Sequence, residues 1–367
     1  MKSLYIHIPF CARKCLFCSF AISVGAGHRS DEYIDALEKE LQQHQHQKIS
    51  TIYFGGGTPT FLNDGQISRI VLMIKNNFCI DANASWSIEA NPESIDENKA
   101  RQLRKIGFNR VSLGVQTFND TYLKFLGRAH DKATALNAFF ILRDAGFDNI
   151  NVDLMYGFPK QLRDELDNDL QSVVSLSPEH VSIYTLTIEP NSRFHAAAIK
   201  LDDDEKLGDD YVFVAQFLES KGIMQYEVSN FARPGFQSKH NLAYWQGGDY
   251  IGVGMGAHGL LDGRRYWNEA TLSKYIDAIN SKGLAVAGEE HLDRQTRFTE
   301  DLIFGLRMNE GICVQDLEKR CGVEIKPEQR KMLEDLIEDG FLEKVNDAIR
   351  TTLNGRLVLD ELAVRLI

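Results

Sequence analysis

Residues 5–18 read Tyr5-Ile-His-Ile-Pro-Phe-Cys-Ala-Arg-Lys-Cys-Leu-Phe-Cys18, an apolar segment that runs directly into three closely spaced cysteines. The apolar part, Leu4–Phe10, predicts a buried β-strand, and the loop after it carries Cys11, Cys15 and Cys18. Thiolates are soft ligands that bind iron–sulfur clusters, and three of them serve three of the four irons of a [4Fe-4S] cubane. The pattern therefore predicts one cluster whose fourth iron is open to an external ligand.

A structural zinc site is the alternative interpretation of these cysteines. Zinc prefers four closed ligands, which usually come from paired CxxC units. The remaining cysteines, Cys79, Cys313 and Cys321, are scattered along the chain and form no such pair. We expect them to be small apolar side chains, without a disulfide framework, so the cluster is the favoured interpretation.

The strand before the cysteines is the first of six similar segments, each followed by a stretch with helical periodicity. The segments are Leu4–Phe10, Thr51–Phe54, Trp86–Ala90, Arg110–Val115, Ile150–Tyr156 and Val181–Leu186. Repeated βα units predict a parallel sheet with right-handed crossovers. We therefore expect an α/β fold in which residues 1–203 form an incomplete TIM-like (β/α)6 barrel. Polar or glycine-rich clusters follow the strands, where barrels place their chemistry.

The rest of the chain predicts two further parts. Residues 204–295 begin with a long helix and continue with short strands and Gly-rich turns, as an extension of the barrel. Residues 296–367 predict a small winged-helix-like α+β domain, with helices near 300–307, 314–320 and 327–340. An Asn354-Gly355 pair between Arg350–Leu353 and Arg356–Leu359 predicts its hairpin.

Composition restricts the class of protein. The 367 residues are 43% hydrophobic and 25% charged, which is typical of a folded protein. The net charge of −11 argues against non-specific binding to nucleic acid or anionic lipid. The sequence contains no apolar run of the ~18 residues that a transmembrane helix needs. We expect an unprocessed cytoplasmic chain that does not bind nucleic acid.

The CxxxCxxC loop after the first strand resembles the radical S-adenosylmethionine superfamily. That resemblance implies that S-adenosylmethionine binds the open iron and is cleaved to a 5'-deoxyadenosyl radical. Gly55-Gly-Gly-Thr-Pro59 follows the second strand and resembles the contact to the cofactor's amino group, while the missing Gly-Lys-Ser/Thr ending excludes a phosphate loop. Glu89, at the end of the third strand, is either a ribose contact or a solvated charge.

Longer strings of sequence narrow the resemblance to one group of the superfamily. They are Tyr5–Cys11, Phe54–Pro59, Ser87–Pro92, Val115–Phe118 and Asn151–Pro159. Together they resemble the oxygen-independent coproporphyrinogen III oxidases over nearly the whole chain. The resemblance implies cofactor contacts from Tyr5, Phe17, Gly56, Gly57, Thr58, Glu89, Gln116, Arg128 and Asp153. In the oxidases some of these belong to a second cofactor site, to which Gln116, Arg128 and Asp153 are candidates.

Three departures separate the chain from the oxidases. Phe20 stands where the oxidases have a further cysteine, their long N-terminal extension has no counterpart before Cys11, and His240-Asn-Leu-Ala-Tyr-Trp245 is an added motif. The H-N-x-x-Y-W string resembles the HemW family of haem chaperones, which are not thought to perform the decarboxylation. This resemblance implies haem as ligand, haem-acceptor proteins and an electron donor as partners, and no assigned catalytic residue. The oxidase activity is the alternative.

The added motif is suited to haem on chemical grounds. A neutral imidazole binds iron near pH 7, so His240 is the predicted ligand, and Tyr244 and Trp245 offer flat faces to a macrocycle. The alternative is a packed loop with a hydrogen-bonded histidine, after which His258 and then His7 are the next candidates. Gly252-Val-Gly-Met-Gly256 imitates a dinucleotide fingerprint, but the sequence predicts no helix after it, and we reject a nicotinamide site.

Overall fold

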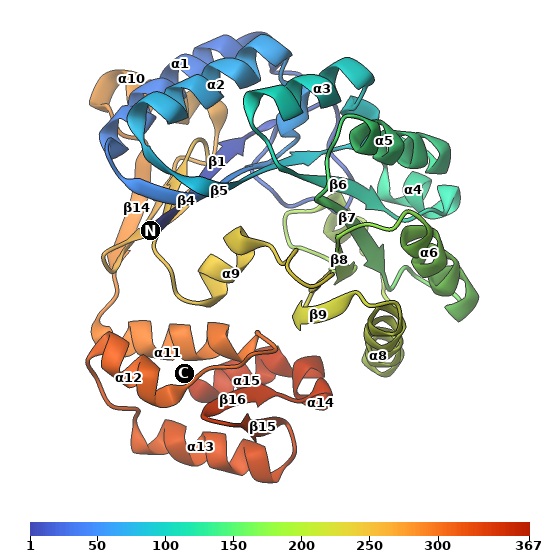
Figure 1. Ribbon diagram of the computed structural model, residues 1–367, viewed down its shortest axis with the longest axis vertical. Coiled ribbons are helices and arrows are strands. Elements are labelled where there is room, and N and C mark those ends of the chain that lie inside the picture. Colours follow the sequence, from blue (N-terminus) through green and yellow to red (C-terminus); the bar gives the residue numbers. More distant parts are fainter.

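A computed structural model describes all residues, 1–367, and is built on one twelve-stranded sheet (Figure 1). Its strand order is β14-β13-β12-β11-β1-β4-β5-β6-β7-β8-β10-β9. The six predicted strands form its parallel centre in the predicted order: β1 (Lys2–Ile8), β4 (Lys48–Gly56), β5 (Cys79–Ala90), β6 (Arg110–Gln116), β7 (Ile150–Tyr156) and β8 (His180–Thr185). The prediction of six βα units is confirmed.

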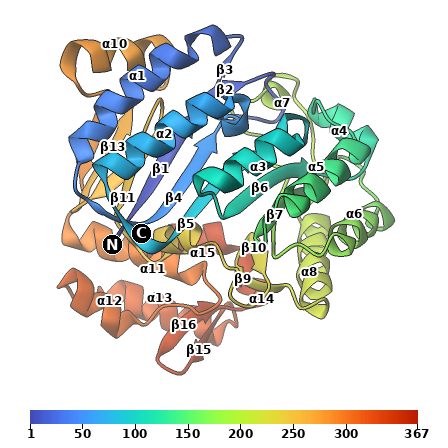
Figure 2. The ribbon, with the colours of Figure 1, turned by 45° about the horizontal axis from the view of Figure 1, so that its top comes forward.

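The helices that connect the parallel strands cover one face of the sheet, which we call the outer face (Figures 1 and 2). They are α1 (Ser30–Leu41), α2 (Asp64–Asn77), α3 (Glu97–Ile106), α4 (Asp120–Leu126), α5 (Lys132–Asp144) and α6 (Arg163–Ser175). Side chains alternate along each strand, so Val111, Leu113 and Val115 of β6 join the main hydrophobic core. Ser112, between them, hydrogen-bonds Asp153 of β7, and the inner face is therefore polar.

Both ends of the sheet carry additional strands that leave the barrel open. On one side β11 (Tyr250–Val253) pairs parallel with β1, and β12 (His258–Leu261), β13 (Arg264–Asn268) and β14 (Val286–His291) continue antiparallel. On the other side β10 (Asn230–Ala232) and β9 (Met224–Glu227) pair antiparallel after β8. Because β9 and β14 do not pair, the expected incomplete barrel is confirmed. Helix α8 (Asp204–Ser220) packs on α6, and α10 (Leu272–Lys282) packs on α1.

The C-terminal domain has its own hydrophobic core, formed by residues between Phe298 and Leu366. Its helices are α11 (Arg294–Leu306), α12 (Val314–Cys321), α13 (Pro327–Glu338), α14 (Leu353–Leu357) and α15 (Leu359–Leu366), with the hairpin β15 (Leu342–Val345) and β16 (Ala348–Thr351). Three helices followed by a hairpin agree with the winged-helix-like expectation.

The predicted position of this hairpin is wrong. The strands turn at Asn346-Asp347, where Asn346 takes a positive φ of 55°. Asn354 and Gly355 instead lie in α14, because the Thr352 side chain accepts a hydrogen bond from Gly355 N and starts a helix there. Gly355 is needed for packing: a Cβ at this position would lie 1.9 Å from the Phe341 carbonyl oxygen.

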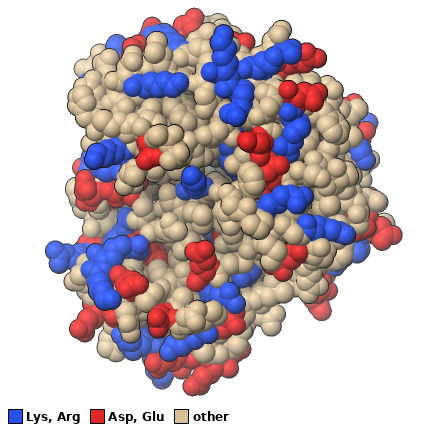
Figure 3. Space-filling model, viewed as in Figure 1, with Lys and Arg blue, Asp and Glu red and all other residues tan.

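A short helix, α9 (Lys239–Trp245), lies between the inner face of the sheet and the C-terminal domain (Figure 1). It carries the H-N-x-x-Y-W motif. On the face drawn in Figure 3, basic and acidic side chains are interspersed without a large area of one sign. None of the helices combines the length and the apolarity that a membrane crossing requires.

Candidate functional site

The cysteine loop begins where β1 ends and is held by backbone hydrogen bonds. Cys11 is buried in the short strand β2 (Phe10–Cys11), which pairs with β3 (Ser23–Val24), whereas Cys15 and Cys18 are half-buried. Leu16 N donates to Leu126 O of α4 (2.9 Å), and Leu16 O accepts from Phe194 N (3.0 Å) of α7 (Arg193–Ala196). The loop is thereby fixed over the C-terminal ends of the strands, as barrel chemistry requires.

Polar groups from two other loops reach the cysteine sulfurs. The Thr58 hydroxyl lies 3.4 Å from Cys11 Sγ, and Arg128 Nη1 donates to Cys15 Sγ at 3.4 Å. Burial raises the pKa of the Cys11 thiol to about 11, so a metal must displace its proton. The sulfurs do not converge as the ligands of a single metal ion would. A cubane binds each thiolate through a different iron, so it does not need the three sulfurs to meet at one metal ion.

The predicted glycines allow the end of β4 to pack closely against the cysteine loop and His7. A Cβ at Gly57 would lie 2.8 Å from Phe10 O and 3.0 Å from Cys11 Sγ, and one at Gly56 would lie 2.6 Å from the His7 ring. Gly56 also has a positive φ of 111°, which side chains rarely adopt. Contacts within the protein exclude larger residues at both positions, and the contact of these glycines with the cofactor's amino group stays a prediction.

Glu89 lies at the end of β5 and is held from the neighbouring strand β4. Tyr53 donates its hydroxyl to Glu89 Oε1 (2.9 Å), and Gly56 N donates to Oε2 (3.2 Å). Burial raises the pKa of Glu89 to about 7, with the charge of Asp153 acting in the same direction. The carboxylate is thus a half-buried acceptor that these hydrogen bonds hold at the cavity wall. Tyr53 was not predicted from the sequence, although its alternation on β4 with Thr51 and Gly55 places it on the inner face.

Gln116, Arg128 and Asn91 meet above Gly114. A Cβ at Gly114 would lie 3.0 Å from Gln116 Nε2, 3.3 Å from Asn91 Oδ1 and 3.5 Å from Arg128 Nη2. Arg128 donates to Asn91 Oδ1 (2.8 Å) and to Gly114 O (2.7 Å), and its buried Nε has no partner within the protein. Gln116 has a positive φ of 72°, and such strain in a non-glycine residue is concentrated at functional sites. The structure thus groups Gln116 and Arg128 beside the cysteine loop.

Asp153 lies deeper on the inner face, away from the cysteines. It accepts from Asn151 Nδ2 (2.6 Å) and from the Ser112 hydroxyl, and burial raises its pKa to about 6. The Nε of the buried Arg110 has no hydrogen-bond partner within the protein, and the charge of Arg110 favours the ionised forms of both Asp153 and Glu89. Sequence analysis did not single out Arg110. A charged residue at the head of an otherwise apolar strand was the available signal.

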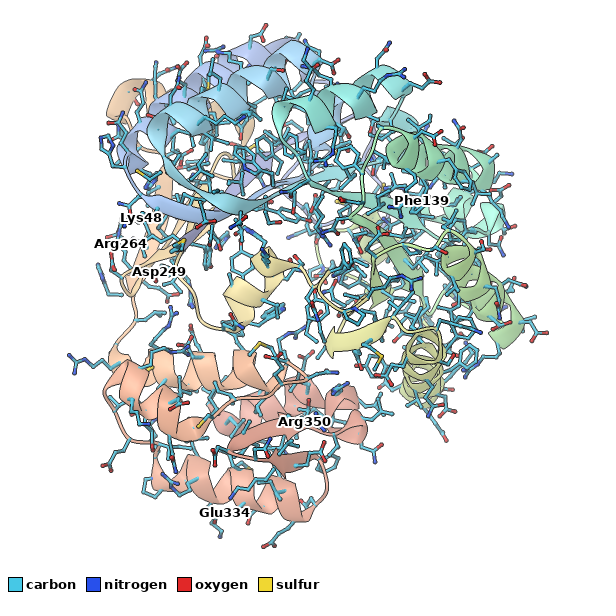
Figure 4. The ribbon with its side chains drawn as sticks, in the orientation of Figure 1. Lys48, Phe139, Asp249, Arg264, Glu334 and Arg350 are labelled. Carbon is cyan, nitrogen blue, oxygen red and sulfur yellow. The ribbon has the colours of Figure 1, made fainter.

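A cavity of about 740 Å³ opens next to this site. Its walls come from both domains and from the segments between them. The barrel and the segment after the cysteine loop contribute Tyr5, His7, Phe20, Ala21, Gly56 and Glu89. Helix α9, the turn after it, the sheet extension and α11 contribute Tyr244, Trp245, Gly247, Gly248, Tyr250, Gly256, His258, Leu260, Arg265, Arg297, Glu300, Asp301, Ile303 and Phe304. Side chains crowd the space between sheet and α9 (Figure 4), and Asp249 and Arg264 mark the nearby edge of the extension. The cavity therefore joins the barrel to the C-terminal domain.

His240, the predicted iron ligand, is buried and packed against the sheet. Thr51 Oγ1 lies 2.8 Å from His240 Nδ1, the Tyr244 hydroxyl lies 3.0 Å from Nε2, and the ring stacks on Tyr53 at 5.0 Å. Burial lowers its pKa to about 3. Neither nitrogen is free in this arrangement, and His240 does not line the cavity. Of the motif, Tyr244 and Trp245 reach the cavity wall.

The remaining predicted residues divide between the cavity and packing. Tyr5 lines the cavity and hydrogen-bonds His7 Nδ1 (3.1 Å). Phe17, predicted as a cofactor contact, packs against a small apolar cluster that contains Leu126 and Phe194. Gly252–Gly256 forms a turn between β11 and β12, with no helix after it, so its rejection as a nucleotide fingerprint agrees with the structure.

Comparison with known proteins identifies the family. The family model described as Radical SAM superfamily matches residues 5–173, and that described as HemN C-terminal domain matches residues 292–358. The heme chaperone HemW of Bacillus subtilis is 35% identical over 98% of this chain and 98% of its own. That of Lactococcus lactis is 34% identical over 96% of this chain and 94% of its own. The chain belongs to the HemW family.

The fold also matches a solved structure described as coproporphyrinogen III oxidase (HemN) from Escherichia coli, a radical SAM enzyme. The TM-score is 0.87 at 29% identity, covering 99% of this chain and 89% of that chain. Membership of the HemW family and the HemN-like radical SAM fold were both predicted from the sequence, and both are confirmed. The fold is shared with the oxidase, so the fold alone does not distinguish a HemW chaperone from an oxidase.

Proposed function

We propose that the protein is a haem chaperone, which binds haem in the cavity between barrel and C-terminal domain and transfers it to acceptor proteins. The relatives over the full length are heme chaperones by name. The observation that carries the proposal is the cavity itself. Its volume of about 740 Å³ suits a macrocycle, and Phe20, Trp245 and Phe304 give it aromatic walls.

The buried edge of this cavity also offers a polar contact. The indole Nε1 of Trp245 is buried without an acceptor in the protein, and Arg265 and Arg297 line the same cavity, where they pair with Glu300 and Asp301. Haem presents an apolar ring with two carboxylates, so aromatic walls and one free N–H donor match its chemistry. The residues present therefore fit haem as the cargo.

The protein holds a [4Fe-4S] cluster and S-adenosylmethionine, as the radical SAM superfamily does. We propose Cys11, Cys15 and Cys18 as the cluster ligands. The cluster supplies one-electron chemistry to the bound cofactor. On the protein side, Gly56 and Gly57 admit the cofactor's amino group, and Glu89 accepts from its ribose hydroxyls. Tyr5, Thr58, Gln116, Arg128 and Asp153 complete the proposed set, and Phe17 supports the loop by packing.

Two partners follow from this proposal. Haem-acceptor proteins receive the cargo, and an electron donor reduces the cluster. Ala12 and Arg13 of the cysteine loop are exposed, which supports access by a donor protein at that surface. The H-N-x-x-Y-W motif contributes to the haem site through Tyr244 and Trp245, with His240 beneath them.

Radical decarboxylation of coproporphyrinogen III is the second candidate, because the fold matches that of the oxidase. The deciding experiment supplies anaerobically reconstituted protein with haem and, in parallel, with coproporphyrinogen III and S-adenosylmethionine. We expect tight haem binding, haem transfer to an apo-haemoprotein and no protoporphyrinogen IX. Robust oxidase turnover, or absence of haem binding, would overturn the chaperone assignment.

A further inference from the structure

Three histidines lie in or next to the cavity, and they differ in what their ring nitrogens already bind. His7 is 6% exposed, with Nδ1 3.1 Å from the Tyr5 hydroxyl and Nε2 2.8 Å from Ala21 O. Both ring nitrogens of His240 are likewise hydrogen-bonded, Nδ1 to Thr51 and Nε2 to Tyr244. His258 is exposed, lines the cavity and makes no hydrogen bond within the protein. We infer that His258 is the side chain that binds the haem iron, an inference that rests on the proposed function.

The backbone that carries His258 is fixed from several directions. Gly254 N donates to the buried Glu40 carboxylate (2.8 Å), and Met255 N donates to the Tyr33 hydroxyl (3.2 Å). Beyond the turn, Asn268 N donates to Ala257 O at 2.9 Å. A Cβ at Gly252 would lie 1.8 Å from His258 O, so β11 and the start of β12 are in direct contact. Because its backbone is immobilised, the imidazole is presented to the cavity at low cost in conformational entropy.

The ring itself is held in an orientation that suits a ligand. It stacks on Trp267, with the ring centroids 6.1 Å apart and 27° between planes. Partial burial and the nearby Arg265 charge lower the pKa of His258, so the neutral imidazole, with its free lone pair, prevails at pH 7. Histidine is a common axial ligand of haem iron, and it needs this neutral form.

The surfaces that share the cavity with His258 complete a haem-sized site. Phe20 is 64% exposed, an unusual position for a large apolar side chain, and it lines the same cavity. Trp245 and Phe304 are in contact, with centroids 5.9 Å apart, and Arg307 lies over the Trp245 ring at 4.5 Å. The exposed Phe20 ring is therefore available to a flat macrocycle whose iron is bound by His258, and Trp245 and Phe304 form the cavity wall beside it.

His240 then has a positioning role. Its bond to the Tyr244 hydroxyl orients Tyr244, and its contacts with Thr51 and Tyr53 fix α9 on the sheet. The other end of the α9 segment contacts the C-terminal domain, where Arg320 Nη1 donates to Gln246 O (2.7 Å). Substitution of His240 therefore disturbs the cavity wall without removing the iron ligand.

The test is a haem titration of the cluster-loaded protein, followed by difference absorption spectra and electron paramagnetic resonance of the ferric haem. His258→Ala should weaken haem binding by more than about tenfold, the lower end of the loss seen when even an outer partner of a metal ligand is removed. Free imidazole should restore the wild-type bands. His291→Ala is the matched control, because His291 is exposed on the same sheet extension but lies outside the cavity.

The outcomes separate this inference from the proposed function. If the wild-type protein binds no haem, the chaperone proposal fails. If it binds haem and His258→Ala leaves affinity and spectra unchanged, only His258 is excluded. His240→Ala should lower affinity while keeping the same iron signals. Loss of those signals in His240→Ala, with rescue by imidazole there, would place the ligand at His240 and overturn the inference.

Discussion

Replacing Glu89 tests the proposed cofactor site most directly. In the protein the half-buried carboxylate receives hydrogen bonds from Tyr53 (2.9 Å) and Gly56 N (3.2 Å), which leave further lone pairs for a ribose. A hydrogen bond to a charged acceptor contributes about 1.5–3 kcal/mol, so Glu89→Ala should weaken S-adenosylmethionine binding by about one to two decades. Tyr53→Phe removes one neighbour of that carboxylate and should cost about fivefold.

The pKa of Glu89 adds a pH dependence with a defined sign. Burial raises this pKa to about 7, and ribose hydroxyls prefer the ionised form, so cofactor binding must expel a proton below pH 7. Affinity should therefore fall by about tenfold between pH 8 and pH 6 in the wild-type protein. In Glu89→Gln this component should be absent, because the amide does not titrate.

Calorimetry on anaerobically reconstituted protein measures both effects. Glu97→Ala, which removes an exposed carboxylate at the start of α3, is the control and should bind as the wild type does. Iron content must be equal in all variants, so that lost affinity reflects Glu89 and not the cluster. Wild-type affinity in Glu89→Ala, or an identical pH profile in Glu89→Gln, would refute the ribose contact.

Two other perturbations have equally definite outcomes. Cys15→Ala should abolish the cluster, which is counted as about four irons and sulfides per chain in the unmodified protein. Cys79→Ala, at an exposed cysteine, should leave the cluster complete. A full cluster in Cys15→Ala would contradict the ligand assignment. Glu40 accepts from Gly254 N, Tyr275 and Asn268, and burial raises its pKa from 4.5 to about 7. Since the folded state favours the protonated form, Glu40 should reduce the free energy of unfolding by about 1.4 kcal/mol between pH 6 and pH 8. Chemical denaturation of Glu40→Gln should show a profile flatter by that amount, and an unchanged profile would show that Glu40 does not titrate there.

The barrel was predictable because its strands carry a strong local signal. Segments such as Arg110–Val115 are apolar and β-branched, and each is followed by a periodic helix, so the order of the parallel strands follows from the connection rules. The strands β9 to β14 are short, and their attachment to the parallel strands, β11 to β1 and β10 to β8, joins segments far apart in the sequence, which leaves no comparable signal. The prediction of a hairpin at Asn354-Gly355 was wrong for a different reason. Thr352 caps a helix at this point, and the close contact of Gly355 with Phe341 requires a glycine whatever the turn type.

The site shows where sequence reasoning reaches its limit. The three cysteines and the glycines at 56 and 57 indicate a cluster site and a cofactor site from the sequence, because few other roles need those residue types at that spacing. The presence of a histidine does not indicate its role in the same way. An imidazole can bind iron when a ring nitrogen is free, and it serves in packing when both nitrogens are hydrogen-bonded. Both nitrogens of His240 are hydrogen-bonded, one to Thr51, which is far away in the sequence, and the other to Tyr244 on the same helix. Only the packed structure shows these two hydrogen bonds. His258 lacks such partners because the turn that precedes it is held by its backbone amides, by Glu40 and Tyr33, which leaves the side chain unused. The difference between a structural and a ligand histidine in this cavity is thus a difference in hydrogen bonding.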